Sequence, residues 1–481
     1  MVPAVFKTVG RLEKATAGSI PASSETLKMK KSSQSSLSRL PQIERLLETD
    51  ELNSWFSRLS RPLVARLAAE TIEEARERIQ GGEAFPGAET IVRAALKRCR
   101  ETARRRIHHL INATGVMLHT NLGRAPVSRT AWRSAEALNT GFSNLELDLQ
   151  TGKRGKRKGI IPDLLSLLVG SEGALMVNNN AAGVFLILSA LAKGKEVIVS
   201  RGEQVQIGGG FRIPEILAQS GARMVEVGTT NITRLEDYTA ALGADTAMVL
   251  MVHSSNFRIR GFTARPSIGE LASSLPGDVL LVVDQGSGTT TERIPGEQSV
   301  SHYLKFGAHL VSFSGDKVLG GPQAGFIVGE EELIQTLARH PLNRVFRPGK
   351  TIYSLMEEAL IARLNRTVPP PIEAVLNLPM EELQERGEAL LSDLPSGRAR
   401  LVDSTVSTGG GSAPDERFPS LSIELESAES PQNLLAALRE LDPPIIGIIV
   451  EGKVQLNLAT LLAEELQAVK EALNRLLSGK S

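Results

Sequence analysis

One lysine in a glycine-rich setting is the side chain of this sequence best suited to covalent chemistry. Lys317 ends the run Ser314-Gly315-Asp316-Lys317, and a glycine-rich turn follows at 320–325. A lysine amine forms a Schiff base with an aldehyde cofactor when its surroundings let it lose its proton. Because a lysine in a loop is usually solvated, this interpretation needs support from a second residue.

An acid at the end of an apolar segment gives that support. Residues 279–283 are all Val or Leu, and Asp284 follows them, ahead of a glycine-rich stretch at 285–288. An acid there can pair with a pyridinium nitrogen and keep it protonated, so that the ring accepts electrons. An Asp in this place is otherwise a turn or cap residue. Asp284 followed by Lys317, each at a strand end, is the order expected of a pyridoxal-phosphate (PLP) enzyme with an aminotransferase-like fold.

Three further residues at predicted strand ends could contact such a cofactor. Asn179 and Asn180 stand between a strand and an apolar helix, where free backbone N–H groups favour a phosphate. A plain helix cap is the alternative. His253 follows an apolar segment and could stack on the cofactor ring, although a structural role explains this histidine equally well.

The region around these residues alternates apolar segments with helical stretches. The predicted strands are rich in β-branched residues and are mostly 20 to 30 residues apart, at 174–177, 196–199, 224–227, 247–252, 279–283, 310–313 and 325–328. This spacing predicts an α/β domain at 110–365 with a largely parallel sheet covered on both faces. Ligands of such sheets bind at the carboxyl ends of the strands.

The segments on either side of this domain have different characters. Residues 1–40 are rich in Ser and Lys without a regular period, which predicts a flexible arm, and residues 41–109 have a helical period. From 366 to 481 we expect a small α+β domain with strands at 421–425, 445–450 and 454–458. Three consecutive glycines at 409–411 precede these strands and indicate a tight or mobile turn.

The predicted helical domain carries a stripe of cations. Its members are spaced as on one face of a helix: Arg93, Lys97, Arg100 and Arg104. Pattern alone favours the solvated face of an amphipathic helix. The more specific alternative is a row of cations that binds the phosphate backbone of an RNA.

The bulk composition limits the class of protein. The chain has 481 residues, of which 41% are hydrophobic and 23% charged, with a net charge of +1. No apolar segment is long enough to span a bilayer, and no secretory signal is evident, so we expect a cytoplasmic protein. The single cysteine, Cys99, excludes an internal disulfide and a multi-cysteine metal site, and we expect no metal.

Taken in order, these motifs resemble the bacterial L-seryl-tRNA(Sec) selenium transferases, or selenocysteine synthases. The resemblance runs from about residue 40 to the end and is carried by the motifs at 111–115, 119–126, 177–182, 199–203, 227–231 and 311–325. It implies a PLP-dependent fold type I large domain at 110–365, a small α+β domain at 366–481 and a tRNA-binding helical domain at 41–109. It also implies a homo-oligomer built as a ring of dimers.

The resemblance assigns roles to individual residues. Lys317 would carry the cofactor and Asp284 would bind its ring nitrogen. Phosphate contacts are expected at Asn179, Asn180 and Ser314. Three arginines match those that would hold an anionic selenium donor: Arg124, Arg344 and Arg347. The implied reaction converts seryl-tRNA(Sec) to selenocysteinyl-tRNA(Sec) with selenophosphate, through a dehydroalanyl intermediate.

Some positions depart from the family pattern. Ile160 stands near an expected histidine, and uncharged residues replace an expected glutamate, arginine, aspartate and arginine at Gln206, Ile232, Gly349 and Ala459.

These departures leave two alternative functions open. One is a divergent PLP lyase for a small amino acid or amino-sugar acid, for which a helical RNA-binding domain has no use. The other is a tRNA-binding protein without catalysis, which leaves Lys317 and Asp284 unexplained.

Overall fold

The computed structural model describes residues 36–207, 210–254, 257–291, 294–413 and 415–478. Of the predicted flexible arm, residues 1–35 lie outside the described residues. The chain divides into two compact units, Met1–His108 and His109–Ser481. No helix among the described residues is long and apolar enough to cross a membrane.

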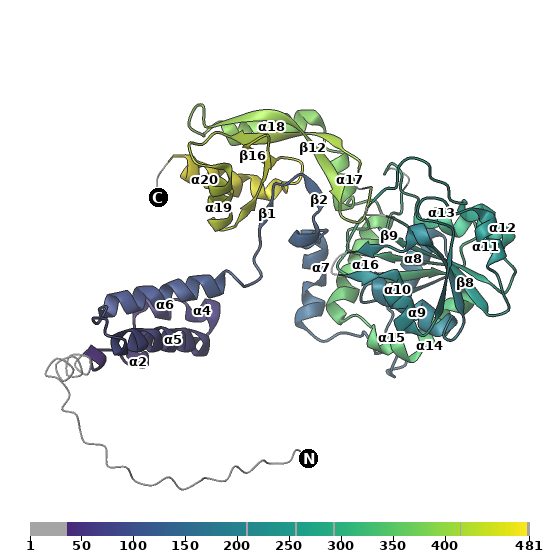
Figure 1. The fold of residues 1–481 in the computed structure, drawn as a ribbon, viewed down its shortest axis with the longest axis horizontal. Helices are drawn as coiled ribbons and strands as arrows, with labels where there is room; N and C mark the ends of the chain where they lie inside the picture. Colours follow the sequence, from purple (N-terminus) through teal and green to yellow (C-terminus); the bar gives the residue numbers. More distant parts are fainter. Residues whose placement is uncertain (1–35, 208–209, 255–256, 292–293, 414, 479–481) are drawn as a thin grey trace, which may run out of the picture. The chain divides into compact units, whose positions relative to one another are not determined.

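The first unit is a small helical bundle (Figure 1). Its helices are α2 (Ile43–Leu47), α3 (Asp50–Asn53), α4 (Phe56–Leu59), α5 (Arg61–Gln80) and α6 (Ala88–Ala103). Helix α6 buries Ile91, Ala95 and Cys99, which recur every four residues and so share one face. Because this face packs on the bundle, the predicted cationic stripe lies on the solvent-exposed side of the helix.

The second unit contains a seven-stranded sheet, and all seven apolar segments predicted as strands belong to it. The strands are β3 (Gly173–Val177), β4 (Glu196–Ser200), β7 (Arg223–Val227), β8 (Thr246–Val252), β9 (Leu280–Gly286), β10 (Leu310–Ser314) and β11 (Gly325–Gly329). Their order is β3-β11-β10-β9-β8-β4-β7, and only β11 runs antiparallel to its neighbours. The prediction of a largely parallel sheet is confirmed.

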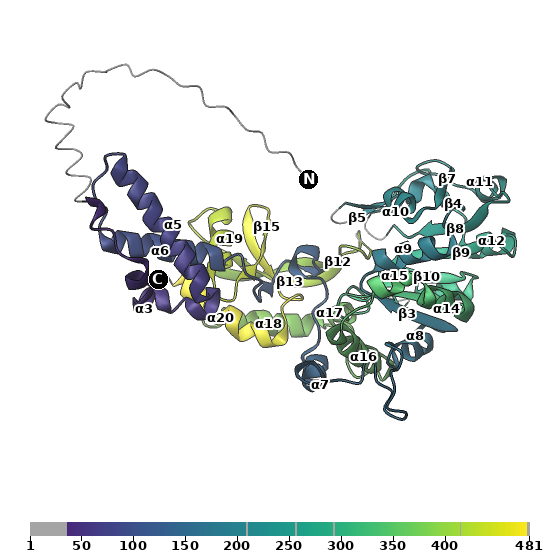
Figure 2. The same ribbon diagram turned by 90° about the horizontal axis from the view of Figure 1, so that it is seen from below.

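Helices cover both faces of this sheet, as Figures 1 and 2 show. One face packs on α8 (Ile161–Val169), α12 (Ile268–Ser274), α13 (Val300–Lys305) and α16 (Lys350–Leu364). The other packs on α9 (Asn180–Leu191), α10 (Ile213–Ser220) and α14 (Glu331–Arg339). Since both faces are buried, the strands are apolar almost throughout, which is why they were recognisable in the sequence.

A second sheet and three helices form the C-terminal part of this unit. The sheet contains β12 (Ala399–Gly409), β13 (Phe418–Leu425), β15 (Ile448–Val450) and β16 (Lys453–Asn457), and it packs with α18 (Met380–Leu391), α19 (Pro431–Glu440) and α20 (Leu466–Leu477). Two early strands pair with C-terminal strands: one joins this sheet, and the other forms a separate two-stranded sheet. β2 (Val116–Leu118) pairs with β12, and β1 (Ile111–Asn112) pairs with β14 (Ile445–Ile446). The residues that open the predicted 110–365 domain thus pair with the C-terminal part.

The remaining elements connect or flank these layers. They are α7 (Arg129–Thr140), α11 (Leu235–Ala240), α15 (Pro341–Val345), α17 (Pro371–Leu376), β5 (Gln206–Ile207), β6 (Phe211–Arg212), η1 (Thr120–Leu122), η2 (Arg201–Glu203) and η3 (Ala463–Glu465). Helix α7 packs against α16.

Candidate active site

Lys317 lies buried in the loop that follows β10. Its Nζ donates a 3.0 Å hydrogen bond to the carbonyl oxygen of Gly286 at the end of β9. Burial and the nearby Arg124 cation lower the pKa of Lys317, and the charges of Asp284, Asp316 and Glu297 oppose them only in part. A lowered pKa makes the neutral amine, which attacks aldehydes, more abundant near neutral pH.

Asp284 lies on the neighbouring strand β9 and is also buried. Its Oδ1 accepts a 2.7 Å hydrogen bond from the side-chain amide of Asn180, at the start of α9. Burial raises the pKa of Asp284, and the Asn180 hydrogen bond and the charge of Lys317 offset this in part. A cationic partner beside this carboxylate would stabilise its ionised form.

The two asparagines predicted as phosphate contacts differ in their roles. The Asn179 side chain caps α9 by accepting from the N–H of Ala182 at 2.8 Å. The Asn180 side-chain N–H donates to Asp284. The Oδ1 of Asn180 is buried without a hydrogen-bond partner among the described residues. Gly325 allows this turn to lie close, because a Cβ there would be 2.2 Å from Asn179. Ser314, the last residue of β10, is buried and pairs with Gly325 across the two strands.

His253 follows β8 and lies at the same edge of the sheet. Its backbone N–H donates to the carbonyl oxygen of Asp284 at 2.9 Å, which fixes it beside the β9 end. Its Nε2 lies 3.2 Å from Oε2 of Glu297, within ion-pair distance, and both ring nitrogens are buried without a hydrogen-bond partner among the described residues. The ring therefore lies against the Glu297 carboxylate on its Nε2 side, and its Nδ1 is available to a ligand.

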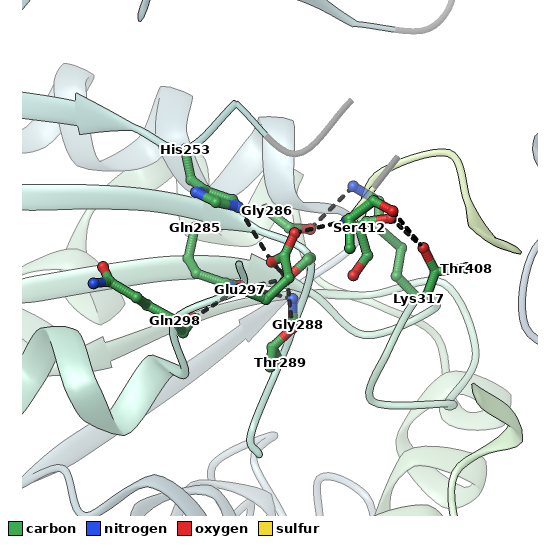
Figure 3. A network of polar contacts seen from close by, with 12 residues as sticks. His253, Gln285, Gly286, Gly288, Thr289, Glu297, Gln298, Lys317, Thr408 and Ser412 are labelled. Atoms are coloured by element: carbon green, nitrogen blue, oxygen red, sulfur yellow. Dashed lines mark hydrogen bonds and ion pairs between the residues drawn. The ribbon is translucent and has the colours of Figure 1, made fainter. Parts of the chain in front are cut away.

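Glu297 is the functional candidate that the sequence did not reveal. Its carboxylate is buried between His253, Ser287 and the backbone of Ala413. Figure 3 shows Glu297 next to His253. Burial alone would raise the pKa of Glu297, but His253, Ala413 and Ser287 outweigh it and lower this pKa. Glu297 lies in a loop without a strand or helix period, so only its nearness in sequence to Asp284 could have indicated a functional role.

These residues fit pyridoxal phosphate. A buried amine with a lowered pKa, a buried acid on the next strand and unpartnered polar atoms on Asn180 and His253 face the carboxyl edge of the sheet. The arrangement can hold an aldehyde cofactor on Lys317 and a cationic ring nitrogen at Asp284. The described residues contain no group of three His, Cys, Asp or Glu suited to a metal ion.

Comparison with known proteins decides the family. The model for "L-seryl-tRNA selenium transferase" matches residues 110–462, and "Selenocysteine synthase N terminal" matches residues 37–76. The L-seryl-tRNA(Sec) selenium transferase of Moorella thermoacetica is 41% identical over 92% of this chain and 97% of its own length. That of Hyphomonas neptunium is 40% identical over 91% and 98%.

The chain belongs to the L-seryl-tRNA(Sec) selenium transferase family.

The fold agrees with this assignment. A solved structure of D-glucosaminate-6-phosphate ammonia-lyase superposes with a TM-score of 0.57 over 78% of this chain and 96% of that one, at 19% identity. At that identity the likeness concerns the fold alone. The chain is thus a PLP-dependent selenium transferase with a fold type I large domain, as the sequence predicted.

The arginines expected to bind a selenium donor in this transferase lie in two places. Arg124 donates to Oδ2 of Asp316 at 2.7 Å, directly beside Lys317. Arg347 lies 3.7 Å from Glu146, a carboxylate that also pairs with Arg154 and Arg157. Arg344 is exposed. Within the part of the chain that the structure describes, Arg124 alone of the three contacts the Lys317 loop.

The basic stripe of the transferase's helical unit lies on the exposed side of α6. Arg93, Lys97, Arg100 and Arg104 are all exposed, and Lys97 is 3.9 Å from Glu101. Arg98, between them, instead turns toward Glu70 and Glu74 of α5. The bundle therefore neutralises the cation on its inner side and presents the predicted stripe to solvent.

The departures from the family pattern lie away from Lys317 and Asp284. Ile160 and Gly349 cap α8 and α16, Gln206 accepts from Arg212 at 2.9 Å, and Ile232 bridges Ala264. Ala459 is buried in the C-terminal core. None of these residues contacts the paired lysine and acid in the described structure.

Proposed function

We propose that this enzyme converts seryl-tRNA(Sec) to selenocysteinyl-tRNA(Sec), with selenophosphate as the selenium donor and phosphate as the other product. The single observation that carries the proposal is the buried Lys317 amine beside buried Asp284, in a chain that matches curated selenium transferases over nearly its whole length. The names of these relatives specify seryl-tRNA(Sec), and the proposed selenium donor is an anion that the Arg124 cation beside Lys317 could bind.

Lys317 and Asp284 have complementary roles in this proposal. When bound, pyridoxal phosphate supplies an electron sink for the bond changes at the serine α-carbon. Asp284 would hold a cationic ring nitrogen, and Asn180 orients its carboxylate. Lys317 would hold the cofactor, and its amine would serve as the base for the serine α-proton, a role that its lowered pKa favours.

The polar residues around this pair would bind the anionic groups. Asn179, Asn180 and Ser314 are proposed to contact the cofactor phosphate near the start of α9, where free N–H groups favour an anion. His253 would lie against the cofactor ring. Arg124 is the arginine best placed for selenophosphate, because its guanidinium lies beside Asp316 and can bind oxygens in pairs.

The helical unit would bind the tRNA. The exposed cations of α6 provide a row of phosphate contacts, and one family model for the N-terminal region of selenocysteine synthases overlaps α2 to α5. A lyase acting on a small amino acid would have no use for this unit.

We also propose that the enzyme is a homo-oligomer. Large apolar side chains are exposed on the second unit, among them Phe142, Leu149, Leu167 and Val345. Such groups are commonly covered by another subunit. Light scattering on purified protein would give the mass, and a monomer at micromolar concentration would rule this out.

The decisive experiment is turnover of seryl-tRNA(Sec) with selenophosphate. We expect selenocysteinyl-tRNA from the wild type, much less from seryl-tRNA(Ser), and none from Lys317→Ala. Lys317→Ala should also lack the cofactor's absorbance and borohydride labelling at residue 317, while it still retards tRNA in a gel. Product from Lys317→Ala, or none from cofactor-loaded wild type, would refute the proposal.

A further inference from the structure

Glu297 is a buried carboxylate that contacts polar groups from three separate segments. Oε2 accepts from Ser287 Oγ at 2.9 Å and lies 3.2 Å from His253 Nε2. Oε1 accepts from the N–H of Ala413 at 2.9 Å. Only 2% of the Glu297 side chain is exposed, so these protein groups replace water as its partners.

The hydrogen bonds around Ser287 leave its hydroxyl proton for Glu297. Ser287 Oγ is itself 2.6 Å from the Gln285 amide, which donates to it, and 2.8 Å from Thr289 Oγ1. Ser287 therefore has its single proton available for Glu297. An ionised carboxylate satisfies all these donors, whereas an amide in its place would present two hydrogens to some of them.

The turn that Glu297 holds lies against the amine of Lys317. Residues 409–413 form a turn at the end of β12, and Thr408 Oγ1 donates to the carbonyl oxygens of Ser412 and Ala413, which tightens the turn. At Gly411 a Cβ would be only 2.8 Å from Lys317 Nζ, and its φ of +99° also favours glycine. The turn therefore forms part of the wall around the amine (Figure 3).

We propose that Glu297 is a positioning residue of the active site, which holds His253 and the 409–413 turn in place around Lys317 through one shared carboxylate. The imidazole that would face the cofactor and the small-domain turn that covers the amine are then fixed together. This inference rests on the function proposed above only for the identity of the cofactor.

The test compares Glu297→Gln with wild type in cofactor binding and in pH dependence. We expect Glu297→Gln to bind pyridoxal phosphate about tenfold more weakly, since a charge-assisted contact is lost. The pH at which the bound cofactor changes absorbance should fall, because a negative charge that stabilises nearby protonated groups is removed. Neither measurement requires tRNA or selenium.

Glu373→Gln is the matched control. Glu373 is a buried carboxylate paired with Arg363 at 2.6 Å, with 10% of its side chain exposed, and it touches neither His253 nor Lys317. We expect this variant to keep wild-type cofactor affinity and pH dependence. An equal loss in both variants would mean a general loss of stability and would overturn the proposal, as would wild-type values for Glu297→Gln.

Glu297→Asp keeps the test decisive if Glu297→Gln does not fold. Its charge is retained but its reach is shorter by one methylene, so we expect weaker cofactor binding with an unchanged pH transition. Wild-type affinity in Glu297→Asp would contradict the positioning role. Failure of selenium transfer by wild type, with these cofactor effects intact, would instead refute the proposed function and leave the role of Glu297 standing.

Discussion

The side-chain amide of Asn180 donates a 2.7 Å hydrogen bond to Oδ1 of Asp284, a residue 104 positions further along the chain. The bond joins the start of α9 to the end of β9. It orients the carboxylate that we assign to the cofactor's ring nitrogen.

Loss of this bond should weaken cofactor binding before it affects the fold. We expect Asn180→Ala to bind pyridoxal phosphate roughly tenfold more weakly, because a hydrogen bond to a charged group contributes about 1.5–3 kcal/mol. Equilibrium titration followed by absorbance measures this. Asn139→Ala, which removes an amide bonded to Ser354 away from the site, serves as the control. Equal affinity in the two variants would contradict the role of Asn180.

Arg124 should set the pH at which Lys317 becomes reactive. Burial first and the Arg124 cation second lower the pKa of Lys317. Arg124→Gln removes a positive charge and leaves Asp316 unpaired, and both changes raise this pKa. The rate of cofactor uptake by cofactor-free enzyme, which needs the neutral amine, should fall near pH 7 and recover at higher pH.

Stopped-flow absorbance over a pH series checks the Arg124 prediction. Arg129→Gln is a suitable control, because this exposed arginine pairs with Glu464 instead. A rate profile for Arg124→Gln that moves to lower pH, or one that coincides with the control, would be inconsistent with the electrostatic effect.

The exposed cations of α6 should contribute to tRNA affinity. Charge reversal at Arg93, Lys97 and Arg100 should weaken binding strongly and flatten its dependence on salt, since fewer counterions are released. The matched control reverses Arg76 and Arg78, exposed cations of α5 already paired with Glu73 and Glu83. If both sets of variants bind tRNA alike in filter assays at several salt concentrations, the stripe is an ordinary solvated face.

Glu203 should make the stability of the protein fall as pH rises. Burial raises the pKa of Glu203 to about 7, and its Oε2 accepts from the N–H of Val252 at 3.0 Å. Between its ordinary pKa and 7 the folded state holds more protons than the unfolded state, so stability decreases with pH. Relative to wild type, Glu203→Gln should gain up to about 3 kcal/mol between pH 5 and 8.

Urea unfolding at several pH values measures this difference. Glu270→Gln, which changes an exposed carboxylate at the start of α12, controls for the loss of an acid nearby. Parallel stability curves for wild type and Glu203→Gln would show that Glu203 titrates normally.

Much of the large domain could be predicted because its strands are buried on both faces. Continuous Val and Leu segments such as 279–283 are recognisable without knowledge of their partners, and the residues after them, Asp284 and Lys317, follow from the rule that ligands bind at strand ends. The pairing of these two residues was therefore accessible from the sequence.

Contacts between distant segments could not be predicted in this way. Glu297 lies in an irregular loop, and its role depends on His253 and on Ala413, which is 116 residues further along the chain. Likewise, the first half of β12 is a mixture of half-buried and exposed residues, and only residues 406–408 are buried, so no continuous apolar segment marks this strand. The hydrogen bond from the Asn180 amide to Asp284 also joins residues 104 positions apart, and no sequence pattern indicated it.

Because β1 and β2 pair with C-terminal strands, they can form these pairs only late in translation. Gly115, between these two strands, donates its N–H to Oγ1 of Thr460, a partner 345 residues further along. When residues 110–118 leave the ribosome, neither β12 nor β14 has been translated. The nascent protein therefore lacks the partners of β1 and β2 while the whole seven-stranded sheet is synthesised. A chain released before residue 399 would contain neither partner strand.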